Sequence, residues 1–154
     1  ANISIPALLD CFHLKSNWDV LTANQLGYYY DLFALRTEKY DLNPCGPGER
    51  ATWNNGTDID RLFNIDSGNS KELAPDLGLI PVLSAFGGLG IYKMHLFEGL
   101  RYEPSTVYEK SGKHFLHPET GIKEYDCEHV DIHTKMRDKY NAKIYINTAL
   151  INND

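Results

Sequence analysis

The sequence has few of the features that mark membrane, secreted or nucleic-acid-binding proteins. No apolar run is long enough for a membrane span, and residues 1–14 lack the basic and apolar regions of a signal peptide. The net charge of −6 at pH 7 disfavours a nucleic-acid partner, because phosphate backbones require clustered Lys and Arg.

Cysteine is equally sparse. Cys11, Cys45 and Cys127 are far apart in sequence, and no pair has the C-x-x-C spacing of a zinc site. An odd, scattered set is typical of free thiols in a reducing compartment. We therefore expect a cytoplasmic protein.

The remaining composition is that of an ordinary globular domain. A chain of 154 residues with 42% apolar residues fits a single domain with its own core. The 10 tyrosines and 2 tryptophans are either core and surface residues or sugar-binding rings, because an aromatic ring combines apolar area with a polar tip.

Local patterns predict alternating helices and strands. Ile5, Leu8, Leu9 and Phe12 recur at helical spacing and predict a helix over residues 4–15. A turn over 24–27 is expected between two strands that could form a hairpin or lie near each other in one sheet, and a long loop is expected over 37–56. The other elements expected are strands over 18–23, 29–35, 81–86, 91–93 and 143–147, and helices over 57–63, 94–98 and 127–140, the last with Asp126 as N-cap. This interspersion favours an α/β fold.

The glycines at 87, 88 and 90 follow an apolar strand. A glycine pair there lets a ligand approach the backbone closely. The segment matches neither a P-loop nor a dinucleotide fingerprint, and a bulge or tight bend in the sheet is the alternative interpretation.

A second candidate site is the start of the helix over 127–140. Glu128 lies in the first turn, where the helix dipole favours a carboxylate. His129 and His133 are four residues apart, share one helix face, and could bind one metal ion with a third ligand. The alternative is a well-capped, solvated helix start with two surface histidines.

A literal D-x-D motif, Asp58-Ile59-Asp60, is also present. Such a carboxylate pair can bind the metal ion that neutralises a diphosphate. A turn rather than a buried strand precedes it, so the sequence favours a helix-capping box starting at Thr57.

Several segments, taken in order, resemble GT-A-type polysaccharide glycosyltransferases. These enzymes occur in capsule synthesis and in large DNA viruses that glycosylate their own coats. The resemblance rests on NWDVLTAN at 17–24, YDLFALR at 30–36, PVLSAFGGLGIYK at 81–93, CEHVDIH at 127–133, Met136-Arg137 and KIYIN at 143–147.

The resemblance implies a GT-A-like mixed sheet and transfer of a sugar from a nucleotide-sugar donor to a hydroxyl of a glycan acceptor, with Mn²⁺ or Mg²⁺ as cofactor. Glu128 would be the catalytic base or a direct acceptor ligand, close to the Gly87-Gly88 backbone. We assign the remaining roles as metal contacts by His129 and His133, and substrate contacts by Gly87, Gly88, Asn24, Arg36 and Trp53.

In that family the nucleotide-binding βαβ region and its D-x-D precede the part matched here. We therefore expect residues 1–154 to form one domain corresponding to the C-terminal, acceptor-side part of a GT-A domain, with a sheet incomplete on its N-terminal side. Two alternatives stay open: a non-catalytic carbohydrate-binding module that uses Trp18, Trp53 and the tyrosines, and a glycoside hydrolase that uses Glu128 with another carboxylate.

Overall fold

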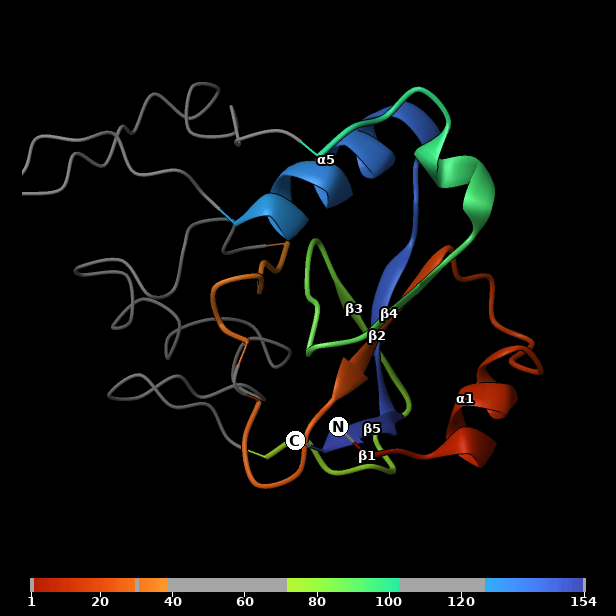
Figure 1. Ribbon diagram of the computed structural model, residues 1–154, viewed down its shortest axis with the longest axis vertical. Coiled ribbons are helices and arrows are strands. Elements are labelled where there is room, and N and C mark those ends of the chain that lie inside the picture. Colours follow the sequence, from red (N-terminus) through yellow and green to blue (C-terminus); the bar gives the residue numbers. More distant parts are fainter. Residues whose placement is uncertain (1, 30, 39–71, 103–126, 154) are drawn as a thin grey trace, which may run out of the picture.

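The computed structural model describes residues 2–29, 31–38, 72–102 and 127–153. These residues form an α/β fold with a mixed sheet (Figure 1). The predicted fold class is confirmed at this level. None of the helices among the described residues has the length and apolar character needed to cross a membrane.

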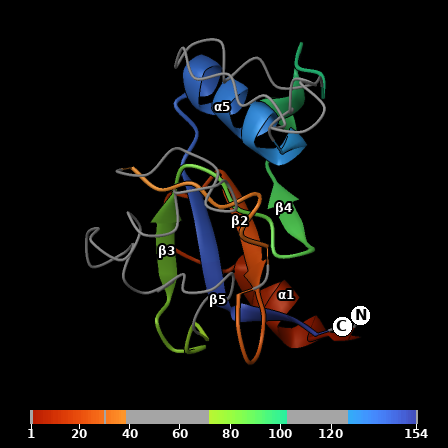
Figure 2. The same ribbon diagram turned by 90° about the vertical axis from the view of Figure 1, so that its left-hand side faces the viewer.

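Strand β5 (Ile144–Asn153) is the centre of the sheet. It pairs in parallel with β2 (Val20–Asn24) and antiparallel with β3 (Leu79–Val82). Strand β4 (Gly90–Tyr92) pairs antiparallel with the other edge of β2, which gives the order β3-β5-β2-β4 seen in Figure 2. The short β1 (Asn2–Ile3) pairs with the last residues of β5.

Two apolar clusters cover opposite faces of the sheet, because alternate residues of a strand point to opposite sides. Val20, Ile144 and Ile146 pack with Ile132 and Met136 of helix α5 (Glu128–Tyr140). On the other face, Leu21, Ala23 and Leu150 pack with Trp18 and with Cys11 of helix α1 (Ile5–Cys11).

Helix α1 is shorter than the predicted 4–15. Ser4 caps its first turn by accepting a hydrogen bond from the amide of Ala7. Of the apolar residues at helical spacing, Ile5, Leu9 and Phe12 are exposed and Leu8 is partly buried, whereas Cys11 is fully buried. The spacing therefore predicted the helix but does not identify its buried face.

Helix α5 matches the predicted 127–140 closely. Its N-cap is Cys127 and not Asp126, which lies outside the described residues. Asn141, in the left-handed conformation at φ 52°, ends the helix. The helical turn expected at 94–98 is the 3₁₀ helix η1 (Met94–Phe97), followed by Gly99 at φ 68°.

The strand predicted over 29–35 is wrong, and with it the hairpin to β2. Residues 32–34 form a turn, begun by the Asp31 carboxylate, which accepts a hydrogen bond from the amide of Ala34. The apolar character of this segment reflects the burial of Tyr29, Leu32 and Leu35 in the core, not an extended backbone.

The strands predicted over 81–86 and 91–93 are observed as β3 and β4, on either side of Gly87 and Gly88. β3 begins earlier than the predicted 81–86, and residues 83–89 lead from it into β4. Gly87 and Gly88 have φ of 66° and 79°, so a tight bend does occupy this position. We call residues 84–90 the glycine turn.

The predicted strand 143–147 is the first half of the longer β5. The long loop from residue 39 onward, the helix over 57–63 with its D-x-D motif, and Trp53 lie outside the described residues.

Replacing Gly87 with alanine should destabilise the fold more than replacing Gly78. Both glycines have positive φ, which costs a side-chain-bearing residue about 1–2 kcal/mol. At Gly87 the added Cβ would also collide with the carbonyl of Ala23, whereas at Gly78 it meets nothing. We expect Gly87→Ala to lose about 1–3 kcal/mol more than Gly78→Ala in chemical denaturation. Equal losses would contradict this close approach.

Candidate functional site

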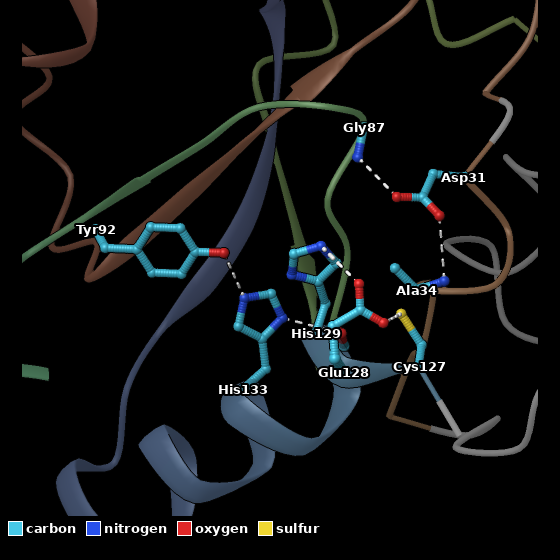
Figure 3. A network of polar contacts seen from close by, with 9 residues as sticks. Asp31, Ala34, Gly87, Tyr92, Cys127, Glu128, His129 and His133 are labelled. Atoms are coloured by element: carbon cyan, nitrogen blue, oxygen red, sulfur yellow. Dashed lines mark hydrogen bonds and ion pairs between the residues drawn. The ribbon is translucent and has the colours of Figure 1, made fainter. Parts of the chain in front are cut away.

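Three segments that are distant in sequence meet at one place. They are residues 31–34, which we call the Asp31 turn, the glycine turn, and residues 127–129 at the start of α5 (Figure 3). The amide of Gly87 donates to Asp31 Oδ2 at 3.3 Å, and the amide of Ala34 donates to Asp31 Oδ1 at 3.4 Å. One carboxylate thus joins two segments of the chain.

The Gly87 peptide is held on its other side as well. Its carbonyl accepts a hydrogen bond from Asn152 Nδ2 at 3.1 Å, and the preceding amide, that of Phe86, donates to the Tyr29 hydroxyl at 3.3 Å. Gly87 is buried and Gly88 is exposed. The turn therefore offers a fixed backbone surface that carries no side chain at Gly88.

Glu128 begins α5 and its side chain is 63% exposed. The Cys127 thiol lies 3.8 Å from Glu128 Oε2 and donates to it. Burial raises the pKa of Cys127 to about 11, so the thiol keeps its proton at neutral pH. This exposed carboxylate combines a favourable helix dipole with a neighbouring donor.

His129 lies between the carboxylates and two aromatic rings. Its ring stacks on Phe86 with centroids 3.8 Å apart, and meets the edge of Tyr102 at 6.2 Å. His129 Nε2 is 3.8 Å from Glu128 Oε1. Burial lowers the pKa of His129 more than the carboxylates of Glu128 and Asp31 raise it, so the imidazole is neutral at neutral pH.

Asp31 is a site residue that the sequence analysis missed. Burial raises its pKa, the hydrogen bonds from Ala34 and Gly87 and the proximity of His129 oppose this, and the charge of Glu128 adds to it. An acid inside an otherwise apolar run was the available signal, because such an acid needs a specific partner when buried. Carboxyl groups with perturbed pKa values are enriched at functional sites.

His133 is fully buried, unlike the surface residue or metal ligand considered from the sequence. Its Nδ1 is 2.9 Å from Ser84 Oγ and its Nε2 is 3.0 Å from the Tyr92 hydroxyl. Burial lowers the pKa of His133 to about 3, so the ring is neutral. With both nitrogens engaged, neither is available to a metal ion in this arrangement.

The Ser84–His133 contact has the spacing of an activated nucleophile. Ser84 is only 1% exposed, so no substrate reaches it in this structure. The contact is therefore structural here.

The proposed substrate contacts fall in different places. Asn24 is fully buried and donates to the carbonyls of Leu73 and Thr148, and Arg36 is buried with Nη1 bound to the carbonyls of Phe33 and Leu35. Both side chains are therefore enclosed within the protein. Gly87 and Gly88 lie at the site, and Trp53 is outside the described residues.

The donor set does not complete a metal site. Among the described residues, no group of three or more His, Cys, Asp or Glu side chains lies close enough together to hold a metal ion. With His133 engaged elsewhere, His129, Glu128 and Asp31 do not form the closed ligand set of a protein metal centre. The cation implied by the resemblance stays a prediction.

No protein-family model matches the chain, and no curated protein or solved structure matches it significantly.

The buried His133 should make stability depend on pH. Above the ordinary pKa of 6.5 the ring is neutral in both states and contributes no pH dependence. Between pH 6.5 and about 3 only the unfolded state binds the proton. As the pH is lowered through this range, the free energy of unfolding should therefore decrease by up to about 1.4 kcal/mol per pH unit. His133→Gln should remove this component. Denaturation curves at several pH values measure it, and identical slopes for the two proteins would contradict the assignment.

Proposed function

We propose that the protein is a glycosyltransferase that transfers a sugar from a nucleotide sugar to a hydroxyl of a glycan acceptor. The observation that supports it best is the position of Glu128. Glu128 is the first residue of α5 and its carboxylate is exposed. It lies beside the glycine turn, close enough to Asp31 and His129 for its charge to affect their pKa values. The segments quoted for the resemblance at 30–36, 81–93 and 127–133 thus meet at one place.

Glu128 has the role of base in this proposal. A hydroxyl is a weak nucleophile at neutral pH, and a carboxylate within hydrogen-bond reach accelerates its attack. As the acceptor oxygen bonds to the anomeric carbon, its proton passes to Glu128. The bond from that carbon to the diphosphate breaks, and the nucleoside diphosphate leaves with the electron pair.

The surrounding groups prepare Glu128 for this step. Glu128 lies at the N-terminus of α5, where the helix dipole favours its charge, and the protonated Cys127 thiol donates to one carboxylate oxygen. The exposed Gly88 leaves room for a sugar to approach the backbone. Mn²⁺ or Mg²⁺ would shield the leaving diphosphate, but no step here depends on it because the described residues do not assemble its ligands.

Glycoside hydrolysis is the second candidate, and Asp31 favours it. Glycosidases use two carboxyl groups in different environments, one kept protonated and one ionised. Asp31 is partly buried and burial raises its pKa, while Glu128 is exposed, so the two carboxyl groups lie in different environments. The carbohydrate-binding alternative loses one of its proposed platforms, since Trp18 is only 9% exposed.

One assay separates these functions. The protein is incubated with a panel of UDP-, GDP- and dTDP-sugars and glycan acceptors, with and without Mn²⁺ or Mg²⁺. Nucleoside diphosphate release that depends on a donor sugar supports the transferase. Release of free sugar from glycans without any nucleotide supports the hydrolase. Glycan binding without either reaction supports the binding module.

Glu128→Gln should reduce kcat for transfer by about 10²–10⁴-fold and leave the KM for the donor nearly unchanged, because only the proton acceptor is lost. Asp138→Asn is the matched control, an exposed acid further along the same helix that should keep wild-type turnover. Steady-state kinetics on both variants measure the effect. Normal kcat in the Glu128 variant would show that Glu128 is only an acidic residue in the first turn of α5, without a catalytic role.

A further inference from the structure

The segment that leads to Tyr102 is fixed to helix α5. Lys139 Nζ and the Tyr140 hydroxyl both donate to the carbonyl of Glu98, each at 2.7 Å. Lys135 Nζ donates to the carbonyl of Arg101 at 3.1 Å. These contacts hold residues 98–101 against α5, and Tyr102 follows directly.

The Tyr102 ring ends a row of three aromatic groups. Phe86 and His129 stack with an interplanar angle of 17°, and Tyr102 meets His129 edge-on at 85°. Both contacts have the spacing and orientation that aromatic rings favour. The Phe86 and His129 side chains are partly buried, whereas Tyr102 is 49% exposed. The row therefore presents its outermost ring to solvent.

This exposed ring lies in the neighbourhood of Glu128, because His129 contacts both: its ring is 6.2 Å from that of Tyr102, and its Nε2 is 3.8 Å from Glu128 Oε1. Burial raises the pKa of Tyr102, and the charge of Glu128 raises it further. The phenol is therefore protonated at neutral pH and is able to donate a hydrogen bond. An apolar ring face, a phenol donor and an exposed carboxylate thus occur together at the start of α5.

We propose that Tyr102 forms a binding subsite for the acceptor sugar, with the C–H face of a pyranose ring packed on the tyrosine ring and a sugar hydroxyl directed to Glu128. This rests on the proposed function, in which Glu128 takes its proton from the acceptor. In that mechanism the sugar that gives its proton to Glu128 is the acceptor. A ring beside Glu128 is therefore expected to contact the acceptor sugar and not the nucleotide. Because the segment is already anchored, binding orders few additional groups.

The test compares three changes at position 102 with one at a matched tyrosine. Tyr102→Ala removes the ring and should raise the acceptor KM about tenfold, with kcat and donor KM within about twofold. Tyr102→Phe keeps the ring and should stay close to wild type. Tyr102→Leu keeps apolar bulk without a flat ring and should behave like the alanine variant. Tyr28, which is exposed to a similar extent at 52%, supplies the control Tyr28→Ala.

The kinetic result decides the subsite separately from the proposed function. Transfer by the wild type with an unchanged acceptor KM in Tyr102→Ala and Tyr102→Leu would overturn the subsite and leave the transferase standing. An equal rise in Tyr28→Ala would overturn it too. Thermal unfolding of each variant shows whether a rise in acceptor KM comes from impaired folding. If Tyr102→Ala is destabilised, the acceptor KM of Tyr102→Leu decides between the outcomes.

A binding measurement covers the case in which the wild type shows no transfer. Saturation-transfer NMR with a panel of methyl hexopyranosides is recorded for the wild type and the same variants. Contacts that persist in Tyr102→Phe and disappear in Tyr102→Ala support the sugar subsite even though the transferase proposal has failed. Absence of contacts in the wild type, or contacts retained by Tyr102→Ala, overturns it.

Discussion

The imidazole of His133 connects helix α5 to both arms of the glycine turn, and the geometry of the site depends on this connection. Ser84 precedes the two glycines and Tyr92 follows them. The Nδ1 of His133 contacts the Ser84 hydroxyl, and its Nε2 contacts the Tyr92 hydroxyl. A neutral imidazole that satisfies both nitrogens is buried without leaving an unpaired polar atom. Gly90 takes part indirectly, because a Cβ there would collide with the Tyr92 ring that reaches His133. This arrangement places the first turn of α5, with Glu128, beside the turn.

A second set of contacts fixes the glycine turn at Gly87. Asp31 accepts a hydrogen bond from the amide of Gly87, and Asn152 donates one to the carbonyl of Gly87. Removing a carboxylate from water, even in part, is costly unless its oxygens are paired, and the partly buried Asp31 is paired with two backbone amides. The backbone and Asp31 are thus held in place, while Glu128 and Tyr102 remain exposed on that support. Rigid support beneath a few accessible groups is the condition for a preorganised binding or catalytic site.

Local sequence patterns predicted the elements whose formation depends on nearby residues. The helix over 127–140, the turn at 94–98 and the strand around Val20 were found within a few residues of their observed bounds, and the start of the strand at Ile144 within one residue, although this strand continues to Asn153. The segment 29–35 was not, because a short apolar run has the same composition in a buried turn as in a strand. The Asp31 side chain that begins this turn is a local signal, and weighing it would have favoured the turn. In α1 the exposed Ile5, Leu9 and Phe12 show that an apolar stripe does not by itself identify the buried face.

The sequence by itself determined an α/β fold, the glycine bend and a helix that starts with Glu128, His129 and His133. Only the tertiary structure decided how these residues are used. His129 and His133 are four residues apart on one helix, yet one borders the exposed carboxylate and the other is enclosed between Ser84 and Tyr92. Likewise, Asn24 and Arg36 point inward and Asp31 reaches Gly87. Each of these outcomes depends on packing around the side chain, and the decisive partners of His133, Asn24 and Asp31 lie more than 40 residues away in the chain. Helical periodicity relates only residues within a few positions of each other, so it could not supply those partners.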